Sequence, residues 1–333
     1  MPMPESRSLK IVGLGCYLPK RVVPSSEVEK RCGLPEGWAY RKTGVMERRW
    51  VNGETSSYMG CQAASQAIAE AGLKLTDIDL ILNASGTQPQ AIPDGAHLLQ
   101  RELGLGDSGI PCMTVHTTCL SFLTAMDVSS ALLATGRYRH ILIVSTDIAS
   151  TGIDFEQPES AVLFGDAAAA AVVTTSPAGE PSAILASRME SYSEGADFTR
   201  ILGGGTNRHP NDPRTTRKDN LFDMNGPRVY KLGNRIAGPF LEKLRPGLSS
   251  GLGSISLVVP HQASILAIRS LRHFGVPDDR VCVTLDRYGN CVAASLPLTL
   301  CLAVQSGRLR RGDEVLLIGT GAGLCIGGMI LVY

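Results

Sequence analysis

Residues 113–127 read Met-Thr-Val-His-Thr-Thr-Cys-Leu-Ser-Phe-Leu-Thr-Ala-Met-Asp. The β-branched residues up to Thr118 predict the end of a buried strand, and the apolar periodicity that follows predicts a helix, so Cys119 stands on the elbow between them. A thiol there meets unpaired backbone N–H groups and the positive end of the helix dipole, and both favour the nucleophilic thiolate. The alternative is a small buried filler, the usual place of a free cysteine.

Helix-like and strand-like segments alternate along the chain, which indicates a layered α/β fold. In the first part we expect strands at 9–15, 78–84, 113–117, 140–146 and 168–174, and helices at 56–71, 91–103 and 120–135. In the second part we expect helices at 227–244, 264–274 and 292–306, and strands at 255–260, 281–285, 314–319 and 324–333. The intervening segment 194–220 is polar and rich in Gly, Pro and Arg, which predicts the rim or lid of a site.

Two parts of the chain repeat the same local order of strand, elbow, helix, Gly-Arg turn and strand. The first runs through Thr-Val-His-Thr-Thr-Cys at 114–119, and the second through Val-Thr-Leu-Asp-Arg-Tyr-Gly-Asn at 283–290. This repetition predicts an internal duplication with halves 1–176 and 177–333. Cys119 and Asn290 then stand on equivalent elbows.

Three further residues complete a candidate site. His261 directly follows an expected strand, Asn290 stands at a strand–helix boundary, and Ala322 lies in the glycine-rich turn Gly-Thr-Gly-Ala-Gly-Leu at 319–324. Strand ends converge in a duplicated α/β fold, so we expect Cys119, His261 and Asn290 to share a pocket. Cys119 would attack a thioester, and the backbone N–H groups of Cys119 and Ala322 would form an oxyanion hole. His261 and Asn290 would stabilise the enolate of a second thioester.

Five motifs carry a family resemblance. They are Thr-Thr-Cys-Leu-Ser-Phe, Phe-Gly-Asp-Ala-Ala-Ala-Ala-Ala-Val from Phe164, His-Gln-Ala-Ser, Gly-Asn-Cys-Val-Ala-Ala-Ser and Gly-Ala-Gly-Leu. In this order the chain resembles the 3-oxoacyl-acyl-carrier-protein synthase III family of the thiolase superfamily, from about Lys10 to Tyr333. The resemblance implies a thiolase-like, five-layered αβαβα fold, a homodimer, and a catalytic triad of Cys119, His261 and Asn290.

The resemblance also suggests where a carrier would bind. Trp38, Arg41 and Lys42 resemble the family segment that grips the carrier's nucleotide or pantetheine portion. Lys231, Arg269 and Arg272 could form a basic rim that docks an acidic acyl carrier protein. The alternative for these basic residues is an ordinary solvated surface.

The overall composition excludes several other classes of protein. Lys and Arg number 32 against 31 Asp and Glu, so nothing indicates nucleic-acid binding. The nine cysteines form no Cys-x-x-Cys pair, which indicates a reduced, cytoplasmic protein without a zinc site. Neither a membrane span nor a signal-peptide core is expected. No cofactor is expected beyond the coenzyme A or phosphopantetheine that carries the thioester substrates.

Departures from the family pattern bear on the substrate. Leu266 stands where the family has an arginine that holds coenzyme A, and Gly-Asp-Ala-Ala and Gly-Asn-Cys-Val replace the usual motifs. These changes weaken the case for an ordinary acetyl-coenzyme A primer. The segments around Cys119 and Gly321 also resemble enzymes that join two acyl chains, including α-pyrone-forming ketosynthases. That resemblance implies a Claisen-type condensation that joins two carrier-bound chains in polyketide or other secondary metabolism. The chain-joining olefin enzyme supplies a glutamate base near 89–95, where this chain has only Asp94, so His261 would be the base. The alternatives are decarboxylative priming of fatty-acid synthesis and acyl transfer to an alcohol or amine.

Overall fold

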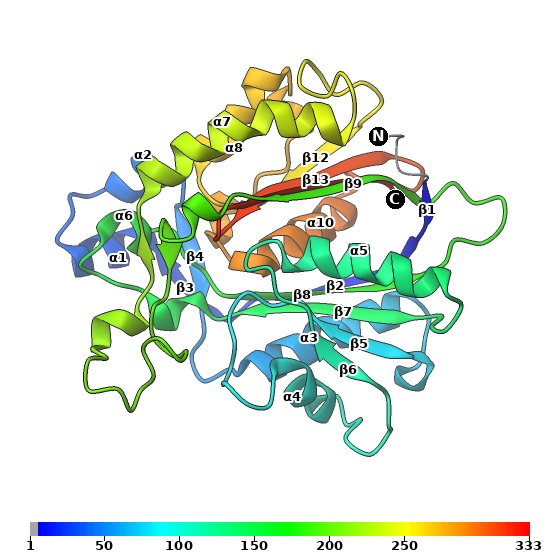
Figure 1. The fold of residues 1–333 in the computed structure, drawn as a ribbon, viewed down its shortest axis with the longest axis horizontal. Coiled ribbons are helices and arrows are strands. Elements are labelled where there is room, and N and C mark those ends of the chain that lie inside the picture. The colour runs from blue at the N-terminus through cyan, green and yellow to red at the C-terminus, as the bar shows by residue number, and fades with distance from the viewer. Residues whose placement is uncertain (1–5) are drawn as a thin grey trace.

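The computed structural model describes residues 6–333 and contains two five-stranded sheets that pack face to face across a layer of helices (Figure 1). The first sheet contains, in spatial order, β2 (Lys10–Tyr17), β8 (Ala167–Thr174), β7 (Ile141–Asp147), β5 (Leu80–Asn83) and β6 (Cys112–Thr114). The second contains β1 (Arg7–Ser8), β9 (Ala183–Ser191), β14 (Cys325–Val332), β13 (Glu314–Gly321) and β12 (Leu257–Pro260).

Helices complete five layers, and their apolar patterns explain their places. Helices α5 (Ser121–Ala134) and α10 (Ser295–Gln305) lie between the sheets (Figure 1) and bury residues on all sides, as a central helix requires. Helix α7 (Gly226–Leu244) buries one stripe that includes Leu232, Ile236 and Phe240. It covers the second sheet with α8 (Ile265–Arg269), and α3 (Ser56–Glu70) with α4 (Gly95–Glu102) covers the first. The expected five-layered α/β fold is thus confirmed.

The two sheets repeat one topology. In the first, β2, β8 and β7 pair antiparallel, and β7, β5 and β6 pair parallel. In the second, β9, β14 and β13 pair antiparallel, β13 and β12 pair parallel, and Val281 adds a parallel bridge to Val258. The boundary expected at 176/177 falls in the connection from β8 to β9, although β1 crosses over to pair with β9.

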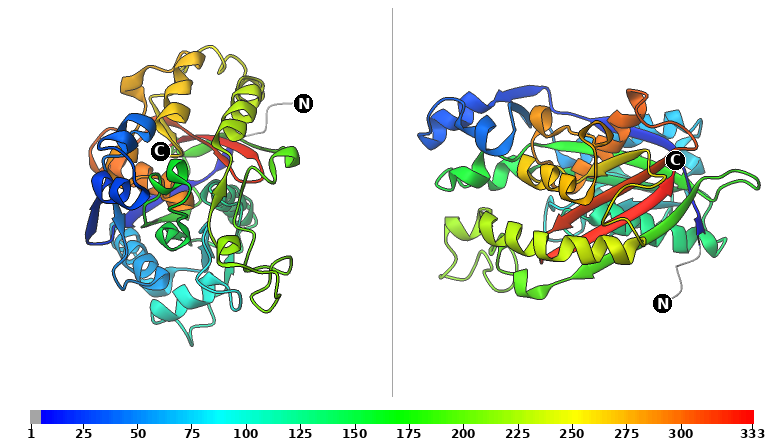
Figure 2. Two further views of the ribbon diagram at one scale, coloured as in Figure 1. Left: turned by 90° about the vertical axis from the view of Figure 1, so that its left-hand side faces the viewer. Right: turned by 90° about the horizontal axis from the view of Figure 1, so that it is seen from above.

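Smaller elements gather at one end of the molecule, as the two views of Figure 2 show for α1, α2 and the 203–220 segment. These elements are α1 (Ser25–Cys32), α2 (Trp38–Thr43), α6 (Pro158–Ala161), the hairpin β3 (Arg21–Pro24) with β4 (Glu47–Trp50), and β10 (Thr199–Arg200) with β11 (Asp223–Met224). Among residues 6–333, no helix is both long and apolar enough to span a bilayer.

The expected strand at 281–285 is wrong. Only Val281 makes a bridge, and Leu285–Tyr288 forms the short helix α9. The buried Gln262 explains the change, because its Oε1 accepts hydrogen bonds from the backbone N–H groups of Thr284 and Leu285, each at 3.0 Å. Those donors are therefore unavailable to a neighbouring strand.

Several expected helices and strands are shorter than predicted or are divided in two. The helix expected at 91–103 begins only at Gly95, because Asp94 caps it by accepting from the Ala96 N–H at 2.8 Å. The segment 264–274 divides into α8 and a 3₁₀ turn at Ser270–Phe274. The strand expected at 113–117 is β6, which ends at Thr114.

Candidate active site

One cavity of about 1490 Å³ is lined by Cys119, His261, Asn290 and Ala322. These residues come from four places in the chain: the elbow before α5, the end of β12, the turn after α9 and the turn between β13 and β14. The convergence expected from a duplicated fold is therefore present. Among residues 6–333, no group of three or more His, Cys, Asp or Glu side chains is arranged to hold a metal ion.

The elbow that carries Cys119 has a strained backbone. Thr118 has a φ of 50°, which is unfavourable for a β-branched residue. Ser121 holds the turn, because its Oγ accepts from the Thr117 N–H at 2.9 Å and donates to the Thr118 carbonyl at 2.7 Å. The elbow thus presents the thiol at the start of α5 in a fixed direction.

The backbone N–H groups of Ala322 and of Cys119 itself act on the Cys119 sulfur and lower the pKa of its thiol. The carbonyl of Ala322 in turn accepts from Thr118 Oγ1 at 3.4 Å and lies 3.8 Å from Cys325 Sγ. The Ala322 carbonyl is therefore held from two sides. These are the two donors that the sequence predicts for an oxyanion hole.

The expectation that the elbow favours the thiolate is wrong for the resting protein. Burial raises the pKa of the Cys119 thiol to about 12, and the neighbouring Asp147 carboxylate and Cys325 thiol act in the same direction. The N–H groups of Ala322 and Cys119 lower the pKa but do not outweigh burial. Cys119 is therefore a neutral thiol at physiological pH.

His261 is held tightly at the end of β12. Its backbone N–H donates to the Ile318 carbonyl at 2.7 Å, and a Cβ added to Gly319 would lie 2.6 Å from the His261 Cβ, so only glycine fits beside it. The ring Nδ1 is sealed from solvent without a partner among the described residues, so Nε2 is the nitrogen available to the cavity. Burial lowers the pKa of His261 to about 4, which keeps the ring neutral.

Asn290 is positioned by the first half of the chain. Its backbone N–H donates to Leu163 at 2.8 Å, and its carbonyl accepts from Gly165 at 3.1 Å. The side-chain Oδ1 accepts from the Val292 N–H at 2.9 Å. This bond fixes the orientation of the amide and leaves Nδ2 as a donor for a ligand.

The six residues expected to bind the carrier do not line the cavity. Trp38 is half-buried against the α1–α6 cluster, and Arg41 donates to the Glu36 carbonyl at 3.3 Å. Arg272 pairs with Asp278, and the others are exposed: Lys42, Lys231 and Arg269. Their role in binding stays a prediction.

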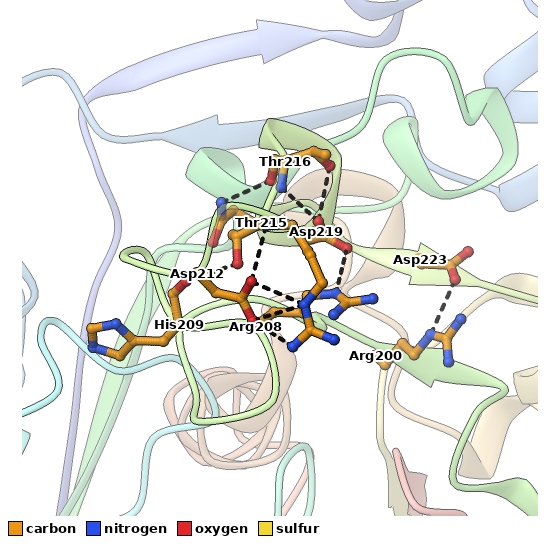
Figure 3. Close-up of polar contacts among 10 residues, drawn as sticks. Arg200, Arg208, His209, Asp212, Thr215, Thr216, Asp219 and Asp223 are labelled. Atoms are coloured by element: carbon orange, nitrogen blue, oxygen red, sulfur yellow. Dashed lines mark hydrogen bonds and ion pairs between the residues drawn. The ribbon is translucent and has the colours of Figure 1, made fainter.

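The polar segment 194–220 forms part of the cavity rim through Arg200, Ile201, Gly203, Gly204 and Asn220. It is held by its own polar contacts, as Figure 3 shows. The Asp219 carboxylate accepts from the Thr216 N–H at 2.7 Å and lies 3.9 Å from Arg208. This segment therefore forms a border of the site, and polar contacts within the segment hold it together.

The sequence patterns predict no catalytic role for three residues that lie near the site. Asp147, at the end of β7, is fully buried beside Cys119. Gly86 lines the cavity, and the exposed His116 places its Nε2 3.2 Å from the Gly86 carbonyl. Of these three residues, Asp147 could have been found from the sequence, because it is the only charged residue of the strand Ile-Leu-Ile-Val-Ser-Thr-Asp.

The two packed halves of this chain have the thiolase fold, which it shares with solved condensing enzymes. The chain belongs to the 3-oxoacyl-[acyl-carrier-protein] synthase III family. The family model described as "3-Oxoacyl-[acyl-carrier-protein (ACP)] synthase III" matches residues 113–193, and the model of its C terminal matches residues 249–333.

Similar proteins span the whole chain. β-Ketoacyl-[acyl-carrier-protein] synthase III of Aquifex aeolicus (strain VF5) is 33% identical over 97% of this chain and 99% of its own. The crystal structure of the Aquifex aeolicus 3-oxoacyl-[acyl-carrier-protein] synthase III gives a TM-score of 0.87 at 31% identity, and covers 98% of this chain and 100% of that one. The priming β-ketosynthase of the R1128 polyketide pathway gives 0.86 at 27% identity, with 100% and 98% covered.

Proposed function

We propose that this chain condenses an acyl thioester with a malonyl group on acyl carrier protein, with loss of carbon dioxide, through an acyl group held on Cys119. The observation that carries the proposal is one cavity in which a thiol with two N–H donors is joined by a neutral imidazole and an oriented amide. The thiol with its two N–H donors suits acyl transfer, and the imidazole with the amide suits stabilisation of an enolate.

In the first step the Cys119 sulfur attacks the carbonyl carbon of the incoming thioester. The N–H groups of Cys119 and Ala322 stabilise the oxyanion, the carbon–sulfur bond to the carrier breaks, and the carrier leaves as a thiol. The proton for that thiol comes from Cys119, which begins the reaction protonated because burial raises its pKa to about 12.

In the second step the malonyl thioester loses carbon dioxide, and the electron pair of the broken C–C bond forms an enolate. The Nε2–H of His261 and the Nδ2–H of Asn290 hydrogen-bond the enolate oxygen. The enolate carbon attacks the acyl carbon on Cys119, the carbon–sulfur bond breaks, and the Cys119 thiolate that leaves takes a proton from water. The product is a 3-oxoacyl thioester on the carrier.

Decarboxylation suits this site better than the joining of two unactivated chains, which the sequence departures had suggested. Chain joining needs a base to remove a proton from the second chain, whereas loss of carbon dioxide needs none. Asp94 is occupied as the cap of α4, with contacts to Ala96 and His97, and burial makes His261 a weak base. The names of the full-length relatives support the decarboxylative alternative as well.

Simple acyl transfer to an alcohol or amine would leave the donors of His261 and Asn290 without a function.

The cavity volume exceeds the roughly 300–1,000 Å³ usual for small-molecule sites, and its wall includes Leu98, Leu241 and Phe274, which supports an acyl group longer than acetyl. Lys231 and Arg269 are exposed beside the cavity residues Tyr230 and Ser270, which supports an acidic carrier protein as the partner.

A homodimer is part of the proposal. Strand β6 is the edge of the first sheet, and its Met113 is exposed. An uncovered edge strand with an apolar side chain suits pairing with a second copy.

The test supplies acyl-coenzyme A of several chain lengths together with malonyl-carrier protein, and measures carbon dioxide and the 3-oxoacyl product. We expect equal amounts of the two. Product without carbon dioxide from two acyl thioesters would instead support chain joining. Transfer of the acyl group to an alcohol or amine without a new C–C bond would contradict condensation.

A further inference from the structure

Asp147 is a fully buried carboxylate that connects the two elbows of the site. Its Oδ1 accepts hydrogen bonds from the Gly86 N–H at 2.9 Å, the Thr87 N–H at 2.6 Å and the Thr87 Oγ1 at 2.9 Å. Its Oδ2 accepts one bond, from the Ala294 N–H at 2.9 Å. Burial of a charge is costly unless donors surround it, so a carboxylate with four donors has a defined structural task.

The loop bound by Asp147 packs against both elbows. A Cβ added to Gly86 would lie 2.5 Å from Val292 Cγ1 and 3.3 Å from the Thr118 carbonyl oxygen. Thr118 precedes Cys119, Val292 follows Asn290 by two residues, and both have a φ of 50°. Strained β-branched residues persist only where their surroundings hold them. Gly86 lies between these two strained residues.

The second carboxylate oxygen holds the Asn290 side of this arrangement. Ala294 ends the short 3₁₀ helix Val292–Ala294 that begins two residues after Asn290. The Val292 N–H in turn fixes the Asn290 amide through Oδ1. The chain of contacts therefore runs from Asp147 through Ala294 and Val292 to the amide that donates to the substrate.

We propose that Asp147 is a positioning residue for the condensation step, since it fixes the Asn290 elbow against the Cys119 elbow through Ala294 and Gly86. This inference rests on the proposed function, because it assigns Asp147 to the second of the two half-reactions. Asp147 does not itself line the cavity. It acts through the backbone of the segments on either side.

The test is Asp147→Asn, which changes the two oxygens unequally. The remaining amide oxygen can serve the three donors of Gly86 and Thr87, so Nδ2 would face the Ala294 N–H, and two donors would oppose each other. We expect acylation of Cys119, measured as release of the carrier thiol, to fall no more than about threefold below wild type, because loss of the Asp147 charge lowers the pKa of the Cys119 thiol. Condensation with malonyl-carrier protein should fall roughly 100-fold in kcat, the loss typical of a misplaced catalytic group.

Two further variants keep the test decisive. Asp154→Asn removes another buried carboxylate, whose bond to the Glu156 N–H at 3.0 Å stays within its own loop, and both half-reactions should remain unchanged. Val292→Gly removes the contact with Gly86 and relaxes the strained φ, so it should reproduce the selective loss of condensation even if Asp147→Asn does not fold.

Parallel loss of both half-reactions in Asp147→Asn and Val292→Gly would overturn the proposal, because that is the effect of general structural damage. Unchanged condensation in a folded Asp147→Asn variant would overturn it too. If the wild-type chain takes the acyl group but releases no carbon dioxide from malonyl-carrier protein, the proposed function itself fails, and the role of Asp147 fails with it.

Discussion

Burial decides the protonation state of the two titratable side chains of the proposed triad, Cys119 and His261. Cys119 stays protonated because burial raises its pKa to about 12, and His261 stays neutral because burial lowers its pKa to about 4. A resting thiolate–imidazolium pair is therefore absent. In the proposed mechanism the nucleophile is activated during the reaction, when the N–H groups of Cys119 and Ala322 stabilise the addition of sulfur to the thioester.

This arrangement predicts the pH dependence of Cys119 alkylation. The fraction of thiolate rises tenfold per pH unit below the pKa, so the rate with iodoacetamide should rise steadily from pH 6 to pH 10 without a plateau. Measurement of the rate by intact mass checks this, with Cys119→Ala as the blank. A plateau near pH 7 would indicate a thiolate held by a charged partner, contrary to the structure.

Asn290→Ala and His261→Ala should separate the two half-reactions. Each removes one donor to the enolate, and loss of such a donor typically reduces the rate by about 10² to 10³. We expect decarboxylation of malonyl-carrier protein to fall by that factor while acylation of Cys119 remains within a few fold. If acylation fell as strongly, these residues would belong to the first step.

At the level of elements, the site depends on a close crossing of two backbone segments. A Cβ on Gly165 would lie 2.0 Å from the Tyr288 carbonyl oxygen, and a Cβ on Gly289 would lie 2.4 Å from that of Leu163. The Phe-Gly-Asp and Tyr-Gly-Asn motifs therefore have one physical cause: two glycines allow the chains to cross, and the crossing supplies both backbone hydrogen bonds of Asn290.

Gly165→Ala should consequently damage both stability and condensation. The new methyl group meets rigid backbone, so we expect a loss of at least about 2 kcal/mol in the free energy of unfolding, measured in urea. Gly106→Ala is the matched control, because no atom lies within 4 Å of its added Cβ and its φ is ordinary. Equal stability of the two variants would contradict a tight crossing.

The sequence predicted the elements that have strong periodicity and failed where a distant side chain intervenes. Local sequence patterns predicted the elbow of Cys119, the strand before His261 and their convergence with Asn290. The structure contains all three features. Strand 281–285 was wrong because Gln262, some twenty residues away, takes the backbone donors of Thr284 and Leu285. The hydrogen bonds of Asp147 join segments that only the finished fold brings together.

At the scale of the whole molecule, the protonation states of Cys119 and Asp147 depend on their burial between the two packed halves. The elbow alone favours a thiolate, but enclosure between the halves reverses this preference at Cys119. The same enclosure raises the pKa of Asp147 from 3.8 to about 6, with burial as the largest cause. Burial therefore links the electrostatics of the site to global stability.

This link predicts how stability changes with pH. Because folded Asp147 binds its proton more tightly than the unfolded chain, its contribution to the unfolding free energy is largest below pH 4 and falls by about 3 kcal/mol as the pH rises through 6. His261 contributes with the opposite sign, so the wild type must be compared with Asp147→Asn in urea at pH 4.5, 5.5 and 7. The difference, wild type minus variant, should decrease with pH. A constant or rising difference would contradict a raised pKa.

In the proposed function one cavity uses Cys119 to hold an acyl group, and His261 with Asn290 to supply its carbon partner. The most direct measurement is intact mass in a single-turnover chase: acyl-coenzyme A first, then malonyl-carrier protein. We predict an acyl adduct that is absent in Cys119→Ala, disappears from the wild type on the chase with release of carbon dioxide, and persists in Asn290→Ala. An adduct in the Cys119→Ala variant, or a wild-type adduct that malonyl-carrier protein leaves in place, would rule out these roles for Cys119, His261 and Asn290.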